Sequence, residues 1–233
     1  MPLAILLSLL IFCSFDLSAQ SNNQSYPLFK SLSYGDQQSS FTAKDGYYDC
    51  EKKYGENLKK FGENLICNDD MQFAEHSFIG VLSFDDNKLN TVILITNFEE
   101  NLMLKIPVIL LKTMPVVMIE GKAEELDLLK LRKEESSDRK SYQQKFLEFA
   151  GRNRANGFVR FTHIEAPENE LFQYNFVMEA IDALPTKTRF AEFIYGDEGA
   201  QPVLVLRFSY PKLDLRNLLK EMKEITEKPV EKF

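Results

Sequence analysis

Few side chains in this sequence are of the types that carry catalysis, and their spacing favours structural roles. The only two histidines are His76 and His163. His163 follows Val159 and Phe161 at alternate positions of an apolar strand pattern, so we expect a partly buried, hydrogen-bonded histidine rather than a catalytic one. His76 lies at the start of another strand pattern and is expected at the surface. Neither has a second histidine or a cysteine at the spacing of zinc ligands, so the sequence predicts no metal and no cofactor.

The cysteines predict a structural disulfide. If residues 1–19 are removed on export, only Cys50 and Cys67 remain, and two cysteines in an oxidising compartment are expected to pair. The segment YGENLKKFGENLIC ends at Cys67, and its Tyr54, Leu58, Phe61 and Leu65 have helical spacing. With a helix near residues 48–61, the chain rises about 18 Å from Cys50 to Gly62, and an extended return from Gly62 to Cys67 covers about 17 Å, so the two cysteines would meet. The spacing of 17 residues does not resemble a redox C-x-x-C pair.

Several enzyme classes lack their usual sequence motifs. The chain has no G-x-S-x-G, no P-loop and no G-x-G-x-x-G, which leaves serine hydrolases, NTPases and dinucleotide-binding enzymes without support. None of its acidic doublets fits a calcium-binding loop; Asp85-Asp86-Asn87 is the nearest and is interpreted as a hairpin turn. A hydrolase whose carboxylates or histidine meet only in the folded chain stays open, because carboxylate pairs in glycosidases are brought together by the fold.

One basic stretch is the candidate binding surface. Between Lys130 and Arg160 there are nine basic and four acidic residues in a chain whose net formal charge is −7. This stretch is interpreted either as a solvated helix surface or as a docking face for an unknown protein or polyanion. The predicted face consists of Lys130, Arg132, Lys133, Arg139, Lys140, Lys145, Arg152 and Arg154.

The N-terminal residues predict export. The apolar run in MPLAILLSLLIFCSFDLSAQ is shorter than the roughly 20 residues of a membrane-spanning helix, and Leu17-Ser18-Ala19 follows it. We interpret residues 1–19 as a signal peptide cleaved after Ala19, with a retained anchor or a buried N-terminal helix as alternatives. Cleavage would remove one acid, Asp16, and no base, which changes the net charge from −7 to −6. An acidic chain without a later spanning run is expected to be secreted or periplasmic and to bind no nucleic acid.

The elements expected along the chain indicate an α+β protein. Residues 20–45 are polar and predict a flexible leader, with one short strand near Phe41. Strands are then expected where β-branched and aromatic residues alternate between turns, and helices where apolar residues recur every three or four positions. Expected strands are 77–84, 89–96, 115–121, 157–164, 170–180, 187–195 and 202–210; expected helices are 98–106 (less surely to 113), 123–153 with a break near 136–137, and 211–228.

Grouped strands with helices at the ends predict a mainly antiparallel sheet, with an N-terminal disulfide-stapled helix and a C-terminal amphipathic helix packed on the sheet. Residues 46–228 are expected to form one α+β domain; two small lobes split near 121–137 are the alternative. The absence of catalytic motifs favours a non-enzymatic binding or assembly module of the cell envelope or extracellular space that contacts another macromolecule. A small apolar-ligand binder using the Phe-rich strands, and the hydrolase described above, are the other hypotheses.

Overall fold

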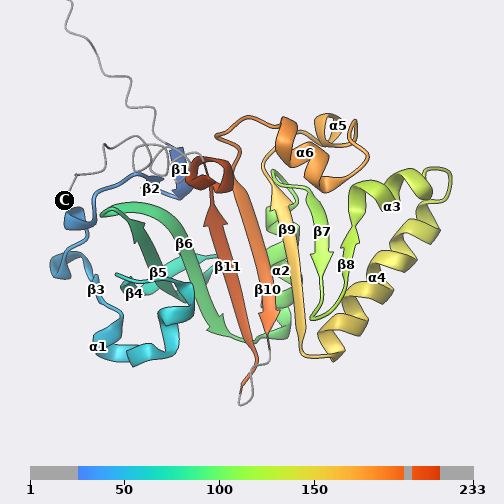
Figure 1. Ribbon diagram of the computed structural model, residues 1–233. Helices are drawn as coiled ribbons and strands as arrows, with labels where there is room; N and C mark the ends of the chain where they lie inside the picture. The colour runs from blue at the N-terminus through green and yellow to red at the C-terminus, as the bar shows by residue number, and fades with distance from the viewer. Residues whose placement is uncertain (1–25, 197–200, 216–233) are drawn as a thin grey trace, which may run out of the picture.

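Among the residues that the structure describes, nine strands form one antiparallel sheet (Figure 1). The computed structural model describes residues 26–196 and 201–215. The strand order is β3-β4-β5-β6-β11-β10-β9-β7-β8, and β1 pairs separately with β2. This large antiparallel sheet, combined with helices, confirms the predicted α+β class. The strands are β1 (Tyr26–Phe29), β2 (Leu32–Tyr34), β3 (Tyr48–Asp49), β4 (Ile66–Phe73), β5 (His76–Asp85), β6 (Lys88–Asn97), β7 (Val116–Glu120), β8 (Glu125–Asp127), β9 (Phe158–Ile164), β10 (Phe190–Gly196) and β11 (Val203–Ser209).

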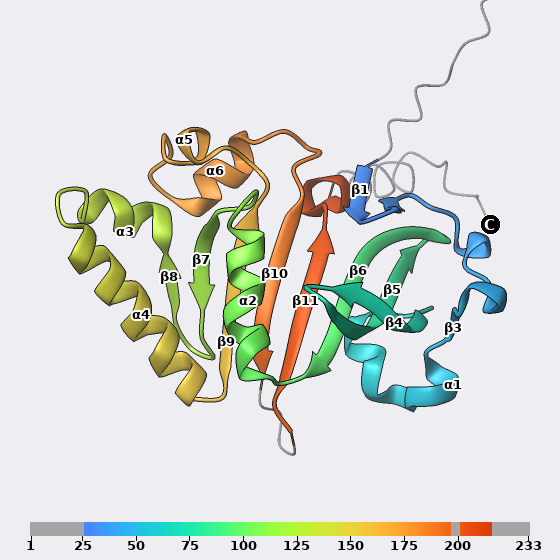
Figure 2. The same ribbon diagram turned by 180° about the vertical axis from the view of Figure 1, so that it is seen from behind.

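Helices cover both faces of the sheet. On the face seen in Figure 2, α2 lies in front of β9 and β10 and runs roughly along them, and α4 lies toward the β8 edge. On the opposite face, α5 and α6 cover one end of β7, β9 and β10, while residues 48–67, here called the disulfide unit, cover β5, β6 and β11. The α-helices are α1 (Glu51–Tyr54), α2 (Glu100–Leu110), α3 (Leu128–Glu134), α4 (Arg139–Ala155), α5 (Glu168–Leu171) and α6 (Val177–Ala183), and the 3₁₀ helices are η1 (Gln38–Ser40), η2 (Ala43–Asp45) and η3 (Gly55–Phe61).

The hairpin of β5 and β6 is the clearest agreement between sequence pattern and structure. Its two-residue turn consists of Asp86 and Asn87, whose φ angles are 47° and 58°. Positive φ at both central positions is typical of the type I′ turn that joins tightly paired antiparallel strands. The expected strands 77–84 and 89–96 are therefore confirmed, as are those at 115–121, 157–164, 187–195 and 202–210.

Helix α2 continues through a proline. Leu102, Ile106 and Leu110 recur every four residues and are buried against the sheet. Pro107 removes one backbone hydrogen bond, yet the helix extends to Leu110 because the buried side chains on either side of it pack on the same core. The helix expected over 98–106, and less surely to 113, thus ends at Leu110.

The strand expected over residues 170–180 is wrong. The structure has α5 and α6 there, joined by residues 172–176. Leu171, Val177 and Ala180 are buried in a separate cluster with residues of β7, β9 and β10. Their burial at helical spacing outweighs the strand propensity of the aromatic residues between them.

The region expected to be a flexible leader contains structure from residue 26 onward. The β1–β2 hairpin places Leu28, which is fully buried, in the main core. Tyr210 donates a hydrogen bond to the carbonyl oxygen of Pro27 at 2.9 Å, and Arg189 donates to that of Leu28 at 3.1 Å. These contacts tie residues 26–34 to the other end of the chain. Residues 20–25 and the expected signal peptide lie outside the described residues.

The disulfide between Cys50 and Cys67 is present, with the two Cα atoms 5.0 Å apart. The single helix expected over 48–61 is wrong. Helix α1 ends at Tyr54, before Gly55 with a φ of 57°, and η3 then extends to Phe61, before the reversal at Gly62. Glycine adopts such positive φ angles without strain, so both glycines shorten the path back to Cys67.

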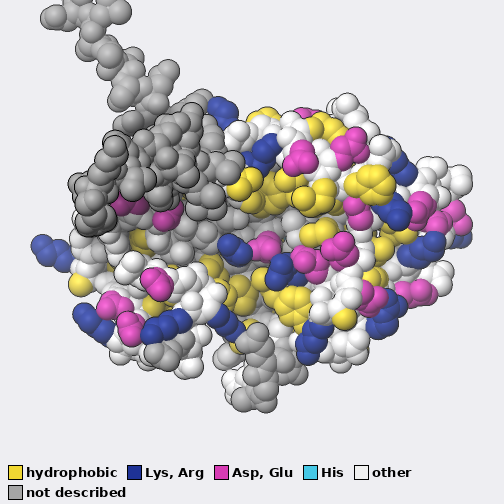
Figure 3. All heavy atoms as spheres, viewed as in Figure 1, with side chains coloured by type: hydrophobic (Ala, Val, Ile, Leu, Met, Phe, Trp, Pro, Cys, Tyr) yellow, Lys and Arg dark blue, Asp and Glu magenta, His cyan; other side chains and the backbone are white. Residues whose placement is uncertain are grey.

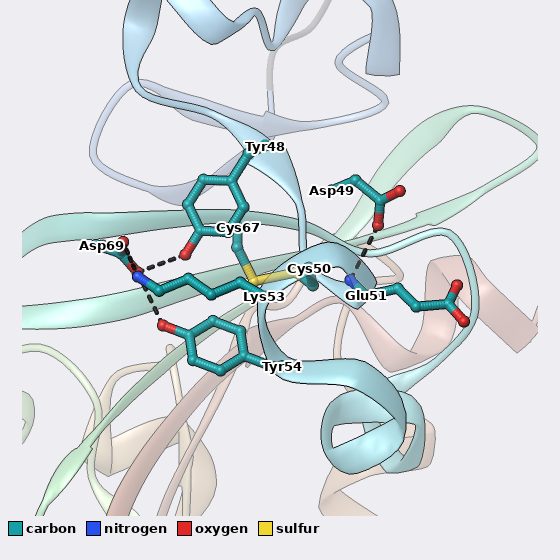
Figure 4. The surroundings of a disulfide bond; sticks show 8 residues. All are labelled: Tyr48, Asp49, Cys50, Glu51, Lys53, Tyr54, Cys67 and Asp69. Atoms are coloured by element: carbon teal, nitrogen blue, oxygen red, sulfur yellow. Dashed lines mark hydrogen bonds and ion pairs between the residues drawn. A yellow bond between two sulfur atoms is a disulfide. The ribbon is translucent and has the colours of Figure 1, made fainter.

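An exposed polar cluster lies beside the disulfide (Figure 4). Tyr54 donates a hydrogen bond to Asp69 at 2.9 Å, and Tyr48 and Lys53 also donate to this carboxylate. Asp69 follows Cys67 in β4, whereas the three donors flank Cys50. The cluster and the disulfide therefore join the same two segments.

The helical segment expected over 123–153 begins instead with strand β8 and then forms α3 and α4, with the break at residues 135–138. Of the expected C-terminal helix, residues 211–215 are helical, and the remainder lies outside the described residues. No helix among the described residues has the length and apolar character needed to cross a membrane.

Candidate functional site: a cavity with two arginines

A cavity of about 750 Å³ lies where α2, α3, α4 and α5 meet beside β7. Helices α2 and α4 run in opposite directions: Arg154 near the end of α4 pairs with Glu100 at the start of α2, at 2.9 Å. The helices diverge toward the other end of α2, as Figure 2 shows. There Leu111 on one side and Tyr142 of α4 on the other line the cavity.

Aspartates at the starts of α3 and α4 fix the two helices that form one wall. Asp127 accepts hydrogen bonds from the backbone N–H groups of Leu129 (2.9 Å) and Lys130 (3.0 Å). Its second oxygen accepts one from the N–H of Val177, which ties α3 to α6. Asp138 caps α4 in the same way. Such N-caps satisfy backbone donors that the first helical turn leaves unpaired.

Arg132 and Arg139 both line the cavity. Arg132 is in the last turn of α3, and its guanidinium carbon lies 3.5 Å from the ring centre of Phe172. A guanidinium stacked on an aromatic face keeps its N–H edge available for an anion. Arg139 begins α4. Within the described part of the chain, neither arginine forms an ion pair.

The cavity also contains a tyrosine and two carboxylates. Burial, the largest effect, raises the pKa of Tyr142 above its ordinary value of 10.0; Arg132 lowers this pKa and Glu168 raises it. Tyr142 therefore stays protonated and can donate a hydrogen bond. Glu135 pairs with Lys145, whose hydrogen bond holds the pKa of this carboxyl below its ordinary value. Among the described residues, Glu168 is then the one carboxylate of the cavity lining that is not paired with a cation. The lining thus has two unpaired arginines and one unpaired carboxylate.

Most of the predicted basic face is used in contacts within the chain. Arg152 forms a bidentate pair with Glu124, with both oxygens 2.9 Å from Nη2. Lys133 donates to the side-chain oxygen of Asn175 at 2.6 Å. Lys130 lies 3.9 Å from Glu134, one turn along α3. Together with the pairs of Lys145 and Arg154 described above, these contacts account for five of the eight residues.

Three members of the predicted face are left: Arg132, Arg139 and Lys140. The structure brings the two arginines together at the cavity, whereas Lys140 does not line it. Whether the eight residues bind a partner stays a prediction.

The aromatic part of this site does not follow from the sequence patterns. Phe172 falls within the strand expected over 170–180, and no motif distinguishes Tyr142. One sequence signal could have placed Phe172 after a helix instead of in a strand. Pro167 is followed by Glu168 and Glu170, and proline with acids in the first turn is typical of a helix start.

The histidines occupy structural positions. His163 is 1% exposed and its Nδ1 lies 2.9 Å from the carbonyl oxygen of Met114, so the predicted hydrogen bond is confirmed, and the side chain is fully rather than partly buried. Burial lowers the pKa of His163 to about 4, although this hydrogen bond raises it. His76 is half-buried rather than at the surface, with its Nε2 3.2 Å from the hydroxyl of Thr96.

Carboxylates on the open part of the sheet are paired with arginines. Figure 3 shows basic, acidic and hydrophobic side chains across the middle of this face. Arg160 of β9 lies 3.4 Å from Glu120 and 3.5 Å from Glu192, and Arg207 lies 3.3 Å from Glu192. These cross-strand ion pairs hold both glutamates in place on the sheet, each with an arginine as its partner.

Within the described residues, no three histidine, cysteine or acidic side chains lie close enough together to hold a metal ion. Comparison of the chain with protein-family models, curated proteins and solved structures found no significant match.

Proposed function

We propose that this chain is an exported, non-enzymatic binding module of the cell envelope or extracellular space that takes an acidic segment of a partner protein into the cavity between α2, α3, α4 and α5. The observation that carries the proposal is the pair of arginines, Arg132 and Arg139, which line the cavity without an ion-pair partner among the described residues. Arginine binds carboxylates through paired N–H groups, and two such side chains at one cavity can hold neighbouring carboxylates of an acidic segment together.

Three properties support export and binding. The disulfide of Cys50 and Cys67 is buried in the structure, and disulfides persist mainly outside the cytoplasm. The residues before Ala19 have the character of a signal peptide. The net charge of the chain is −7, so the protein as a whole should not attract polyanions. The two arginines at the cavity are a local exception that would attract an acidic segment.

The packing of the aromatic strands weighs against a small apolar-ligand binder. Phe161 and Phe193 stack on each other with ring centres 6.0 Å apart, and both belong to the main core. The phenylalanines of these strands therefore fill the interior instead of lining a ligand cavity.

The test is isothermal titration of the purified protein with hexaglutamate peptide at low salt. We expect the double variant R132Q/R139Q to bind about tenfold more weakly or not at all, because both charged hydrogen-bond donors are lost. The matched control is Lys140→Gln, which removes an adjacent charge outside the cavity. Because exposed charges contribute little, we expect this variant to change the affinity for hexaglutamate by less than about twofold.

Two outcomes would overturn the proposal. Equal weakening in R132Q/R139Q and K140Q would mean that the peptide responds to overall charge and not to the cavity. Binding of a sulfated oligosaccharide such as heparin hexasaccharide, with hexaglutamate inert, would assign the basic residues to a polyanion instead of a protein segment.

A further inference from the structure

The outer surface of α2 and the residue after it carry large apolar side chains that are exposed in the described chain. Leu104, Val108 and Leu111 are 64%, 60% and 49% exposed. They follow one another by four and three residues, so they lie along one side of the helix, away from the buried Leu102 and Ile106. Scattered exposed leucines are common in soluble proteins, but a continuous stripe on one helix indicates a contact surface.

This stripe ends at the arginine cavity. Leu111 lines the cavity that contains Arg132 and Arg139, and it also lines a second hollow of about 510 Å³ beside Lys112 and Pro115. From Leu104 to Leu111 the helix rises about 10 Å. A ligand that touched the stripe and the cavity together would therefore need an apolar portion about two helical turns long, followed by an acidic end.

The charges along α2 fit such a ligand. Lys112 follows the helix at the end next to the cavity, whereas Lys105 within the helix is paired with Glu75 at 2.5 Å. The one acid of the helix, Glu100, is at the opposite end and is paired with Arg154. At the cavity end, the stripe thus meets Lys112, Arg132 and Arg139, with Glu168 as the one acid that lines both hollows.

We infer that the partner segment is an amphipathic helix with an acidic end, whose leucine-type side chains pack along Leu104, Val108 and Leu111 while its carboxylates reach Arg132 and Arg139. This inference rests on the proposed function and adds the class of partner to it. Helices recognise one another by such stripes of residues three and four apart, and the acids supply the orientation.

Two peptides of equal charge test the inference by isothermal titration. The first is a 15-residue peptide with Leu at positions 2, 5, 6 and 9 and four Glu at its C-terminal end; the second has Gln in place of every Leu. We expect the Leu peptide to bind at least about tenfold more tightly, because only it can bury apolar surface on α2. The variant L104Q/V108Q should bind both peptides equally, and its binding of hexaglutamate should be unchanged.

Met178→Gln is the matched control. Met178 is as exposed as Leu104, at 65%, but belongs to α6 on the opposite face of the sheet, so its replacement should leave the binding of both peptides unchanged. Thermal unfolding of each variant, followed by circular dichroism, checks that the exposed replacements leave the fold intact.

Equal binding of the two peptides by the unchanged protein would overturn the inference, and so would full binding of the Leu peptide by L104Q/V108Q. The proposed function would still stand if hexaglutamate binding required Arg132 and Arg139. Binding to phosphatidylglycerol vesicles that required Leu104 and Val108, with the Leu peptide inert, would assign the stripe to a membrane surface and also overturn the inference.

Discussion

The guanidinium of Arg132 stacks on the ring of Phe172 at 3.5 Å, although 40 residues of chain separate the two positions. Arg132 comes from α3 and Phe172 follows α5, so the contact joins the two walls of the cavity. The ring holds the arginine in one orientation without neutralising its charge. This arrangement suits an arginine that receives an anion from outside the chain.

Phe172→Leu tests the role of this stacking. Leucine keeps an apolar side chain at this position but lacks the aromatic face, and an exposed cation–π contact contributes about 0.5–1 kcal/mol. We expect hexaglutamate affinity to fall about two- to fivefold, measured by titration, while the midpoint of thermal unfolding changes little. Unchanged affinity would show that the ring does not orient Arg132.

The disulfide should contribute a large share of the stability of the fold. It closes a loop of 17 residues, for which the chain-entropy picture gives about 3 kcal/mol. We expect C50A/C67A to lose about this free energy of unfolding in urea denaturation. In the unchanged protein, iodoacetamide without prior reduction should label neither cysteine; labelling of both would contradict the pairing.

His163 should make the protein less stable in acid. The pKa of His163 is about 4 in the folded chain, because burial disfavours the charged ring, against 6.5 ordinarily. Between these values the unfolded state binds a proton that the folded state does not, so the free energy of unfolding falls as the pH decreases from 6.5 to 4. The loss from this group is up to about 3 kcal/mol.

The pH dependence of the free energy of unfolding contains contributions from both His163 and Asp214, and the contribution of Asp214 has the opposite sign. Burial raises the pKa of Asp214 to about 6, although Tyr34 donates a hydrogen bond to it that favours ionisation. The folded state thus holds this proton more tightly, and stability from this group increases as the pH falls from 6 toward 4. Urea denaturation of D214N and D214N/H163Q across this range isolates the histidine. Parallel curves for the two variants would contradict the account.

The elements that the sequence predicted correctly are those dictated by local pattern. Alternating residues on both sides of Asp86-Asn87 predicted the β5–β6 hairpin, because turn residues and strand alternation agreed. Two cysteines in a chain with an export-like leader predicted the disulfide. Phe172, Tyr174 and Phe176 also alternate, yet here the pattern was misleading: they flank two short helices whose burial against β7, β9 and β10 determines the structure.

The candidate site could be predicted only in part. Arg132 and Arg139 belonged to the predicted basic face, but nothing local distinguished them from Arg152 and Arg154. Those two are neutralised by Glu124 and Glu100, which lie 28 and 54 residues away in the chain. The cavity is likewise formed by segments around residues 111–116, 132–143 and 168–172, and only tertiary packing brings these segments together.

The most direct test of the central claim is a ¹H–¹⁵N NMR titration of the protein with hexaglutamate, including the side-chain Nε–H signals of arginine. We predict that the largest shifts belong to Arg132 and Arg139, with smaller ones at neighbouring backbone amides such as Ser136 and Phe172, and that the signals of Arg152 and Arg154 stay in place. Shifts of similar size at all four arginines, or shifts centred on the disulfide unit, would contradict a binding site in this cavity.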